Sequence, residues 1–211
     1  MIKILIADDH AIVRNGIKQF ILREIPDAKI SEVDNGNELV LQARKGEYDI
    51  VISDVSMPGR SGLEALKQLK EEFPKLPVLI LSMHSEEQYA LRVLKAGASG
   101  YISKDCSPDE MVKAIRQILS GRKYITPGMA EMLAQNIGMD SSGALHEKLS
   151  DREFDVLKKI GAGKTVSEIA QILSLSVNTV STYRVRILEK MNLHTNAELI
   201  HYVIENKLID G

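Results

Sequence analysis

Three acidic residues and one lysine directly follow short apolar runs in the sequence, and side chains of these types can bind phosphate together with a metal ion. Each follows its own run: Asp8 and Asp9 after 2–7, Asp54 after 48–53, and Lys104 after 100–103. Runs of β-branched and aliphatic residues with polar ends are typical of buried parallel strands, whose carboxyl ends form the ligand-binding edge of α/β sheets. Clustered carboxylates need a cation and suit Mg²⁺, while a neighbouring lysine suits a phosphoryl oxygen.

The elements that must position these side chains alternate between strands and helices as far as Gly121. Apolar runs predict strands at 3–7, 29–33, 49–53, 77–82 and 100–103. Amphipathic segments predict helices at 11–24, 36–45, 62–72, 86–96 and 107–120. This succession of β–α units predicts an α/β fold, a parallel sheet with helices on both faces.

The pattern changes after Gly121. Residues 127–136 predict a short helix, and the glycines and serines of 137–145 predict a flexible linker. From Leu149 onward helical patterns alone follow, at 151–161, 165–173, 177–191 and 195–206. We therefore predict a first domain at 1–121, a linker with a short helix at 122–147, and a small all-α domain at 148–211.

Composition sets limits on the class of protein. A hydrophobic content of 44% with 27% charged residues is ordinary for a globular protein, and the net charge of −2 by itself predicts neither a nucleic-acid nor a membrane partner. The chain start lacks the features of a signal peptide, and no long uncharged apolar stretch predicts a membrane span. The single Cys106 fits a reducing compartment, so we expect a cytoplasmic protein without a membrane partner.

The first domain resembles the receiver domain of two-component response regulators. The resemblance rests on motifs in family order: Asp8-Asp9, Asp54 followed by Met57-Pro58 and Gly62, Ser82, and Tyr101 with Lys104. It implies a flavodoxin-like five-stranded parallel sheet in the order 2-1-3-4-5. It also implies that a sensor histidine kinase phosphorylates Asp54, with Mg²⁺ as the cofactor.

The same resemblance assigns a role to each site residue. The metal ligands would be Asp8 through water, Asp9, Asp54 and the backbone carbonyl of Ser56. The phosphate-binding and switch residues would be Ser82, Tyr101 and Lys104, with Tyr101 turning inward after phosphorylation. Ser56 and His84 occupy positions that tune loss of the phosphoryl group. Asp105 follows Lys104 where receivers often have proline, so the sequence leaves open whether that peptide bond is cis.

The predicted helix at 177–191 has two unlike faces. Its inward residues are Val180, Ile187, Leu188 and Met191, and its outward ones include Asn178, Ser181, Thr182, Val185, Arg186 and Lys190. Three basic residues and one acidic residue make the helix locally positive, although the whole C-terminal domain is balanced. Small polar and basic groups suit a DNA major groove, but the pattern alone also fits a helical protein-interaction module.

A second resemblance bears on that choice. Residues 149–208 resemble the LuxR-type helix-turn-helix, through motifs that include Leu149-Ser150 with Arg152-Glu153, Glu168-Ile169-Ala170, Val177 with Thr179-Val180, and Ile187-Leu188 with Lys190-Met191. The domain order is that of the NarL/FixJ class of transcription regulators. The expected DNA-contacting residues are Lys164, Thr165, Asn178, Thr179, Ser181, Thr182, Tyr183, Arg186 and Lys190. Double-stranded DNA with inverted half-sites, a second copy of the chain when active, and RNA polymerase are the implied partners.

The leading hypothesis is a response regulator in which phosphorylation of Asp54 controls dimerisation, DNA binding and transcription. Slow loss of the phosphoryl group would not make it a metabolic enzyme. One alternative is a Mg²⁺-dependent phosphohydrolase with an aspartate nucleophile, but Ser56 stands where such enzymes place a second, proton-donating aspartate. The other is a module whose helical domain binds protein instead of DNA, which would lack salt-dependent DNA affinity.

Overall fold

The computed structural model describes residues 1–83, 86–137, 144–206 and 208. The chain divides into two compact units, Met1–Ala134 and Gln135–Gly211. The predicted domain boundaries at 121/122 and 147/148 stay predictions. The predicted linker at 137–145 lies mostly outside the described residues.

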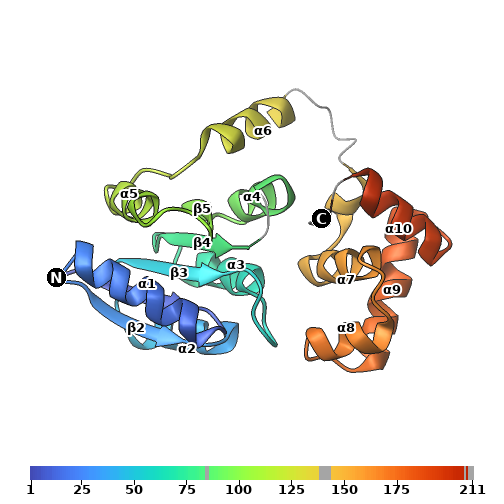
Figure 1. Ribbon diagram of the computed structural model, residues 1–211, viewed down its shortest axis with the longest axis horizontal. Coiled ribbons are helices and arrows are strands. Elements are labelled where there is room, and N and C mark those ends of the chain that lie inside the picture. Colours follow the sequence, from blue (N-terminus) through green and yellow to red (C-terminus); the bar gives the residue numbers. More distant parts are fainter. Residues whose placement is uncertain (84–85, 138–143, 207, 209–211) are drawn as a thin grey trace. The chain divides into compact units, whose positions relative to one another are not determined.

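The first unit contains a five-stranded parallel sheet in the order β2-β1-β3-β4-β5, which confirms the predicted fold class (Figure 1). The strands are β1 (Lys3–Ala7), β2 (Lys29–Val33), β3 (Ile50–Asp54), β4 (Val78–Ser82) and β5 (Gly100–Ser103). The helices that connect and follow them are α1 (Ala11–Glu24), α2 (Gly36–Lys45), α3 (Gly62–Glu72), α4 (Glu86–Lys95) and α5 (Pro108–Leu119).

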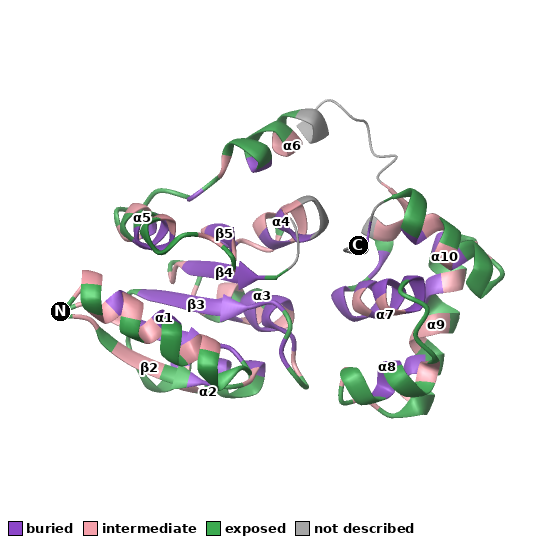
Figure 2. Ribbon diagram, viewed as in Figure 1, coloured by how far each residue is buried: buried purple, intermediate pink, exposed green. Residues whose placement is uncertain are grey.

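The alternation of side chains along each strand builds two apolar layers. Ile4 and Ile6 of β1 belong to one core cluster with Ile17 of α1 and Ile115 of α5, so α1 and α5 cover that face of the sheet. The intervening Leu5 is equally buried, because successive strand residues point to opposite faces. Figure 2 shows the inner strands buried along their length, which explains why they read as continuous apolar runs instead of alternating ones.

The third strand differs from its prediction by one residue. It runs over Ile50–Asp54 instead of 49–53, and Asp54 is paired in register with Leu81 of β4. The phosphoacceptor candidate is therefore the last residue of the strand and not the first residue after it. Its backbone is fixed by the sheet, which holds its side chain in place more firmly than a loop would.

The C-terminal unit is helical, as predicted. Its helices are α7 (Asp151–Gly161), α8 (Val166–Ile172), α9 (Val177–Met191) and α10 (Asn196–Glu205), and α6 (Pro127–Ile137) precedes them in the sequence. A short 3₁₀ helix, η1 (Leu145–Lys148), spans the predicted boundary between the linker and the all-α domain. The sequence did not predict it, because four residues are too few to carry a periodic pattern. The Ser150–Glu153 capping box expected from the sequence is formed at the start of α7.

No described helix is both long enough and apolar enough to cross a lipid bilayer. The peptide bonds of the described residues are all trans, including the bond between Lys104 and Asp105 that the sequence left open.

Gly62 provides a test of how tightly α3 approaches the third strand. A Cβ atom at position 62 would lie 1.7 Å from the backbone oxygen of Asp54, so Gly62→Ala must displace one of the two backbones. We expect a loss of about 1–3 kcal/mol in the free energy of unfolding, or more. Urea unfolding followed by circular dichroism measures it.

Gly16→Ala is the matched control, since no atom lies within 4 Å of its added Cβ on α1. An alanine there should stabilise the protein by about 0.4–1 kcal/mol, because it restricts the unfolded chain. Equal stabilities of the two variants would contradict the close packing at Gly62.

Candidate phosphoacceptor site and helical groove

A lysine bridges two buried carboxylates at the carboxyl edge of the sheet. Lys104 Nζ lies 2.7 Å from Asp54 Oδ2 and 2.6 Å from Asp8 Oδ2. The side chains of Asp8 and Asp54 are 1% and 5% exposed, and that of Lys104 is 7% exposed. The three residues therefore converge at one edge of the sheet, as predicted, and they form an ion-paired cluster there, which the sequence did not predict.

The strand order brings these side chains together. β1 and β3 are neighbours, with Ala7 opposite Ser53, so Asp8 and Asp54 follow adjacent positions. Lys104 directly follows β5, which lies two strands away from β3, and its backbone N–H donates to the carbonyl of Ser82 over 2.8 Å. The long lysine side chain can reach across the end of β4 to the carboxylates.

Burial governs the ionisation of Asp54. Loss of hydration raises the pKa of its carboxyl group, and the charge and hydrogen bond of Lys104 offset this only in part. Burial also lowers the pKa of Lys104, but attraction to Asp54 and Asp8 outweighs it and leaves the pKa above its usual value. The lysine therefore stays charged, and Asp54 is a carboxylate whose negative charge is only partly compensated.

Oxygen donors at this edge suit a hard divalent cation. Asp8, Asp9, His10 and Asp54 each offer one ligand atom, and these atoms lie within 4.8 Å of one another. Atoms on opposite sides of a Mg²⁺ ion would be about 4.2 Å apart, since its bonds are about 2.1 Å long. The spread of up to 4.8 Å is slightly wider, so the side chains would close in by a few tenths of an ångström, and the cluster is consistent with a site for a divalent cation. The Ser56 N–H donates to Asp54 Oδ1 over 3.2 Å, which places the Ser56 backbone beside the same carboxylate.

The other predicted switch residues lie in different settings. Ser82 ends β4 and Tyr101 lies in β5, and both are fully buried. Tyr101 is thus buried in this structure, although the sequence placed its inward position after phosphorylation. Ser56 is exposed beside Asp54, and His84 lies outside the described residues.

An open groove crosses the exposed face of α9 in the second unit. It has a volume of about 340 Å³ and is lined by five of the predicted DNA-contacting residues: Asn178, Thr179, Thr182, Tyr183 and Arg186. Ser181 is exposed on the same helix, while Val180, Ile187 and Met191 are buried as predicted and Leu188 is half-buried. The two faces of α9 therefore separate apolar packing from polar and basic groups.

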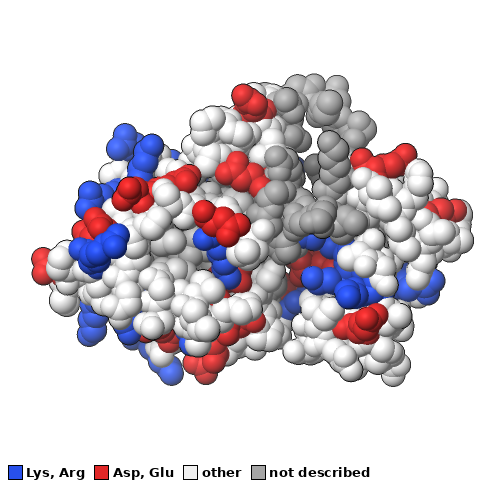
Figure 3. Space-filling view, viewed as in Figure 1, with Lys and Arg blue, Asp and Glu red and all other residues white. Residues whose placement is uncertain are grey.

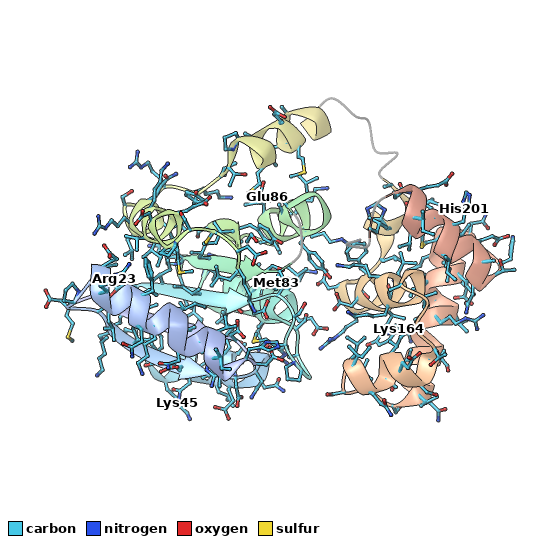
Figure 4. The ribbon with its side chains drawn as sticks, in the orientation of Figure 1. Arg23, Lys45, Met83, Glu86, Lys164 and His201 are labelled. Atoms are coloured by element: carbon cyan, nitrogen blue, oxygen red, sulfur yellow. The ribbon has the colours of Figure 1, made fainter. Side chains whose placement is uncertain are left out.

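Three of the predicted DNA-contacting residues lie elsewhere. Lys190 Nζ is 2.6 Å from Glu153 Oε2, whose side chain is 3% exposed. Burial raises the pKa of Glu153, but hydrogen bonds from Lys190 and Ser150 outweigh it and lower the pKa. Thr165 caps α8 by accepting from the Glu168 N–H, and Lys164 is exposed just before it (Figure 4). Lys190 and Thr165 therefore have structural partners already.

Sequence reasoning missed two features of these sites. His10 Nδ1 lies 2.9 Å from Asp9 Oδ1 and 3.4 Å from Asp8 Oδ1, and its place directly after the acidic pair was the available signal. The Glu153–Lys190 pair joins residues 37 positions apart, for which the chain carries no local signal. Charges of both signs are scattered over the face in view in Figure 3, in keeping with the small net charge.

Comparisons with known proteins follow the same division of the chain. Residues 4–116 match the response regulator receiver domain, and residues 147–203 match the bacterial regulatory proteins of the luxR family. The chain is 37% identical to the response regulator UvrY of Escherichia coli strain K12, over all of this chain and 97% of that protein. It is 36% identical to the response regulator GacA of Pseudomonas protegens, over all of this chain and 99% of that protein.

A solved structure supports the whole-chain likeness. RcsB from Salmonella enterica serovar Typhimurium, bound to promoter rprA in the presence of the phosphomimetic BeF3⁻, is 28% identical to this chain. The match covers 97% of this chain and 99% of that one, with a TM-score of 0.61.

The raised pKa of Asp54 gives a pH-dependent prediction. A carboxyl whose pKa is higher in the folded than in the unfolded state lowers stability as the pH rises above its unfolded-state pKa, and the loss is complete above its folded-state pKa. Asp54→Asn removes that charge and leaves Lys104 paired with Asp8, so we expect a higher melting temperature at pH 7 without metal. The gain should shrink as the pH falls through the folded-state pKa of Asp54. Calorimetry in EDTA across this range measures it.

Lys104→Met is the opposite change within the same ion-paired cluster. It keeps most of the length of the side chain but leaves the buried Asp8 and Asp54 without their cation, and we expect a loss of about 3–5 kcal/mol at pH 7. Changes of the same sign in the two variants would contradict this account of the cluster.

Proposed function

The chain belongs to the two-component response regulators of the NarL/FixJ family, and we propose that a phosphoryl group on Asp54 controls how its LuxR-type domain binds DNA. The observation that carries the proposal is the Asp54 carboxylate at the sheet edge, 2.7 Å from Lys104 Nζ. Members of this family are typically not metabolic enzymes.

Asp54 is the nucleophile in the proposed input reaction. A carboxylate oxygen of Asp54 attacks the phosphorus of a phosphohistidine on a sensor kinase, so an O–P bond forms while the P–N bond breaks and the histidine nitrogen keeps the electron pair. Burial that raises the pKa of Asp54 also makes its oxygen more basic and more nucleophilic. Lys104 is placed to pair with a phosphoryl oxygen as the transferred charge reaches the site.

Asp9, Asp54 and the Ser56 carbonyl would hold Mg²⁺, with Asp8 acting through water. When bound, the ion supplies positive charge that stabilises the transferring phosphoryl group. The chain's own contribution is positional: β1 and β3 place the carboxylates, and the N–H of Ser56 fixes the orientation of Asp54 at 3.2 Å.

Phosphorylation changes the charge balance around Lys104. The phosphoryl oxygens compete with Asp8 for the ammonium group, which lies 2.6 Å from Asp8 in the unmodified protein. Ser82 and Tyr101, buried on β4 and β5, are the residues through which we expect this local change to favour a different conformation.

DNA binding is assigned to the exposed face of α9. The groove residues Asn178, Thr179, Thr182, Tyr183 and Arg186 combine hydroxyl, amide and guanidinium groups, which reach phosphates and base edges in a major groove. Ser181 is a further exposed polar residue of α9, and Lys164, just before α8, is an exposed basic residue that we also assign to DNA contact. A dimer of such domains would read inverted half-sites, because a two-fold axis repeats each contact in reverse.

The phosphorylation step is tested by gel shift with a promoter fragment. Acetyl phosphate and Mg²⁺ should raise the DNA affinity of the wild-type protein and leave that of Asp54→Ala unchanged. Cys106→Ser, a change beyond the ion-paired cluster, serves as the control and should respond like the wild type. An equal response of Asp54→Ala to the phosphodonor would exclude Asp54 as the acceptor.

The DNA-binding face is tested by the salt dependence of affinity. Arg186→Ala should weaken binding and reduce the slope of log affinity against log salt by about 1, because one phosphate contact is lost. Lys148→Ala removes an equal charge from an exposed position of η1 and should keep the slope. If the two variants changed the slope alike, the assignment of the α9 face would be wrong.

A further inference from the structure

We infer that His10 is a nitrogen ligand of a metal ion at the acidic site, and that it strengthens the binding of later first-row transition cations more than that of Mg²⁺. The inference rests on the metal site proposed above and deepens it, since it concerns which cations that site selects. The observation that carries it is the convergence of an imidazole nitrogen and three carboxylates on one small volume.

The distances place His10 within that volume. Its Nδ1 is 2.9 Å from Asp9 Oδ1 and 3.4 Å from Asp8 Oδ1, so it approaches two carboxylates from different residues at once. Together with Asp54, these residues offer four ligand atoms within 4.8 Å of one another. The His10 side chain is 66% exposed, which leaves it free to adjust by the few tenths of an ångström that a metal ion would require.

Backbone geometry directs the imidazole toward the acidic pair. The His10 N–H donates to Asp8 Oδ1 over 2.8 Å, and the Asp8 carbonyl accepts from Arg14 Nη1 over 2.5 Å. These bonds fix the turn that joins β1 to α1. His10, Asp8 and Asp9 therefore lie on one rigid stretch of backbone, which lowers the entropy cost of bringing their side chains together around an ion.

A helix-capping role does not account for this histidine. His10 is the N-cap residue of α1, where a serine or aspartate side chain would accept a backbone N–H, but its side chain makes no capping hydrogen bond. Its two nearest charged partners are instead the proposed ligands Asp8 and Asp9. The remaining alternative is that His10 only pairs with Asp8 and Asp9 and competes with a metal ion for them. That alternative predicts that removing His10 raises the metal affinity.

The donor set decides which cations benefit. Carboxylates and water suit Mg²⁺ and Mn²⁺, whereas an imidazole nitrogen adds affinity mainly for ions later in the first transition row, such as Ni²⁺. With the oxygens of Asp9, Asp54 and Ser56 as direct ligands and Asp8 acting through water, the site should bind Mg²⁺ through oxygen. His10 should then strengthen binding chiefly of transition cations. Manganese accepts both donor types and is therefore a suitable spectroscopic probe.

The test compares cation affinities of the untagged, full-length protein by calorimetry at one fixed pH. His10→Ala should lower the affinity for Ni²⁺ by about tenfold or more, given that even indirect metal partners contribute about 10–100-fold, and change that for Mg²⁺ little. His201→Ala is the matched control, because His201 is an exposed histidine with one carboxylate, Glu205, at 3.3 Å. It should alter neither affinity at the acidic site.

Pulsed EPR of bound Mn²⁺ supplies an independent readout. The wild type and His201→Ala should show a nitrogen coupling from a directly bound imidazole, and His10→Ala should lose it. A coupling that persists in His10→Ala would overturn the inference. So would a rise in the affinity for both cations in that variant, which is the result expected of a histidine that merely competes with the metal for Asp8 and Asp9.

The outcomes also separate this inference from the proposed function. If the wild type binds Mg²⁺ and Asp54→Ala weakens that binding while Ni²⁺ affinity is independent of His10, the metal site stands and the role of His10 is excluded. If the wild type binds neither cation, both the proposed metal site and the role of His10 are excluded.

Discussion

The ammonium group of Lys104 makes the receiver's charged edge compatible with a folded sheet. Two carboxylates, Asp8 and Asp54, are buried within reach of it at 2.6 and 2.7 Å. Without a counter-charge, burying even one of them would cost several kcal/mol. The ion pairs of Lys104 therefore stabilise the site, and phosphorylation can change them, because a phosphoryl group presents new oxygens to the same lysine.

This arrangement depends on the order of the strands. Asp8 directly follows β1, Asp54 ends the adjacent strand β3, and Lys104 directly follows the edge strand β5. The close approach of Gly62 to the Asp54 backbone sets the entry of α3 at the same point, since a Cβ atom there would collide with the Asp54 oxygen. The site thus rests on backbone positions from several elements and not on one loop.

A buried carboxylate is also paired with a lysine in the helical unit. Glu153 is buried at the start of α7, where it caps the helix through Ser150 and pairs with Lys190 of α9 at 2.6 Å. The pair ties α7 to α9 and holds the end of α9 against the core. The groove residues lie on the exposed face of the same helix, where Arg186 precedes Lys190 by about one turn. Val180, Ile187 and Met191 pack on its buried face.

Short-range patterns in the sequence determined much of this protein. Apolar runs located the strands to within one residue, and helical periodicity with caps such as Ser150–Glu153 located the helices, because these signals act between near neighbours. The acidic residues and Lys104 could be assigned to one sheet edge, since parallel strands all end there. Tertiary structure alone decided that Lys104 bridges both Asp8 and Asp54, that Lys190 is engaged by Glu153, and that His10 faces the acidic pair. The two lysine contacts join residues that are far apart in the sequence, and the His10 contact depends on the conformation of a tight turn. No local sequence pattern encodes which side chains meet in these cases.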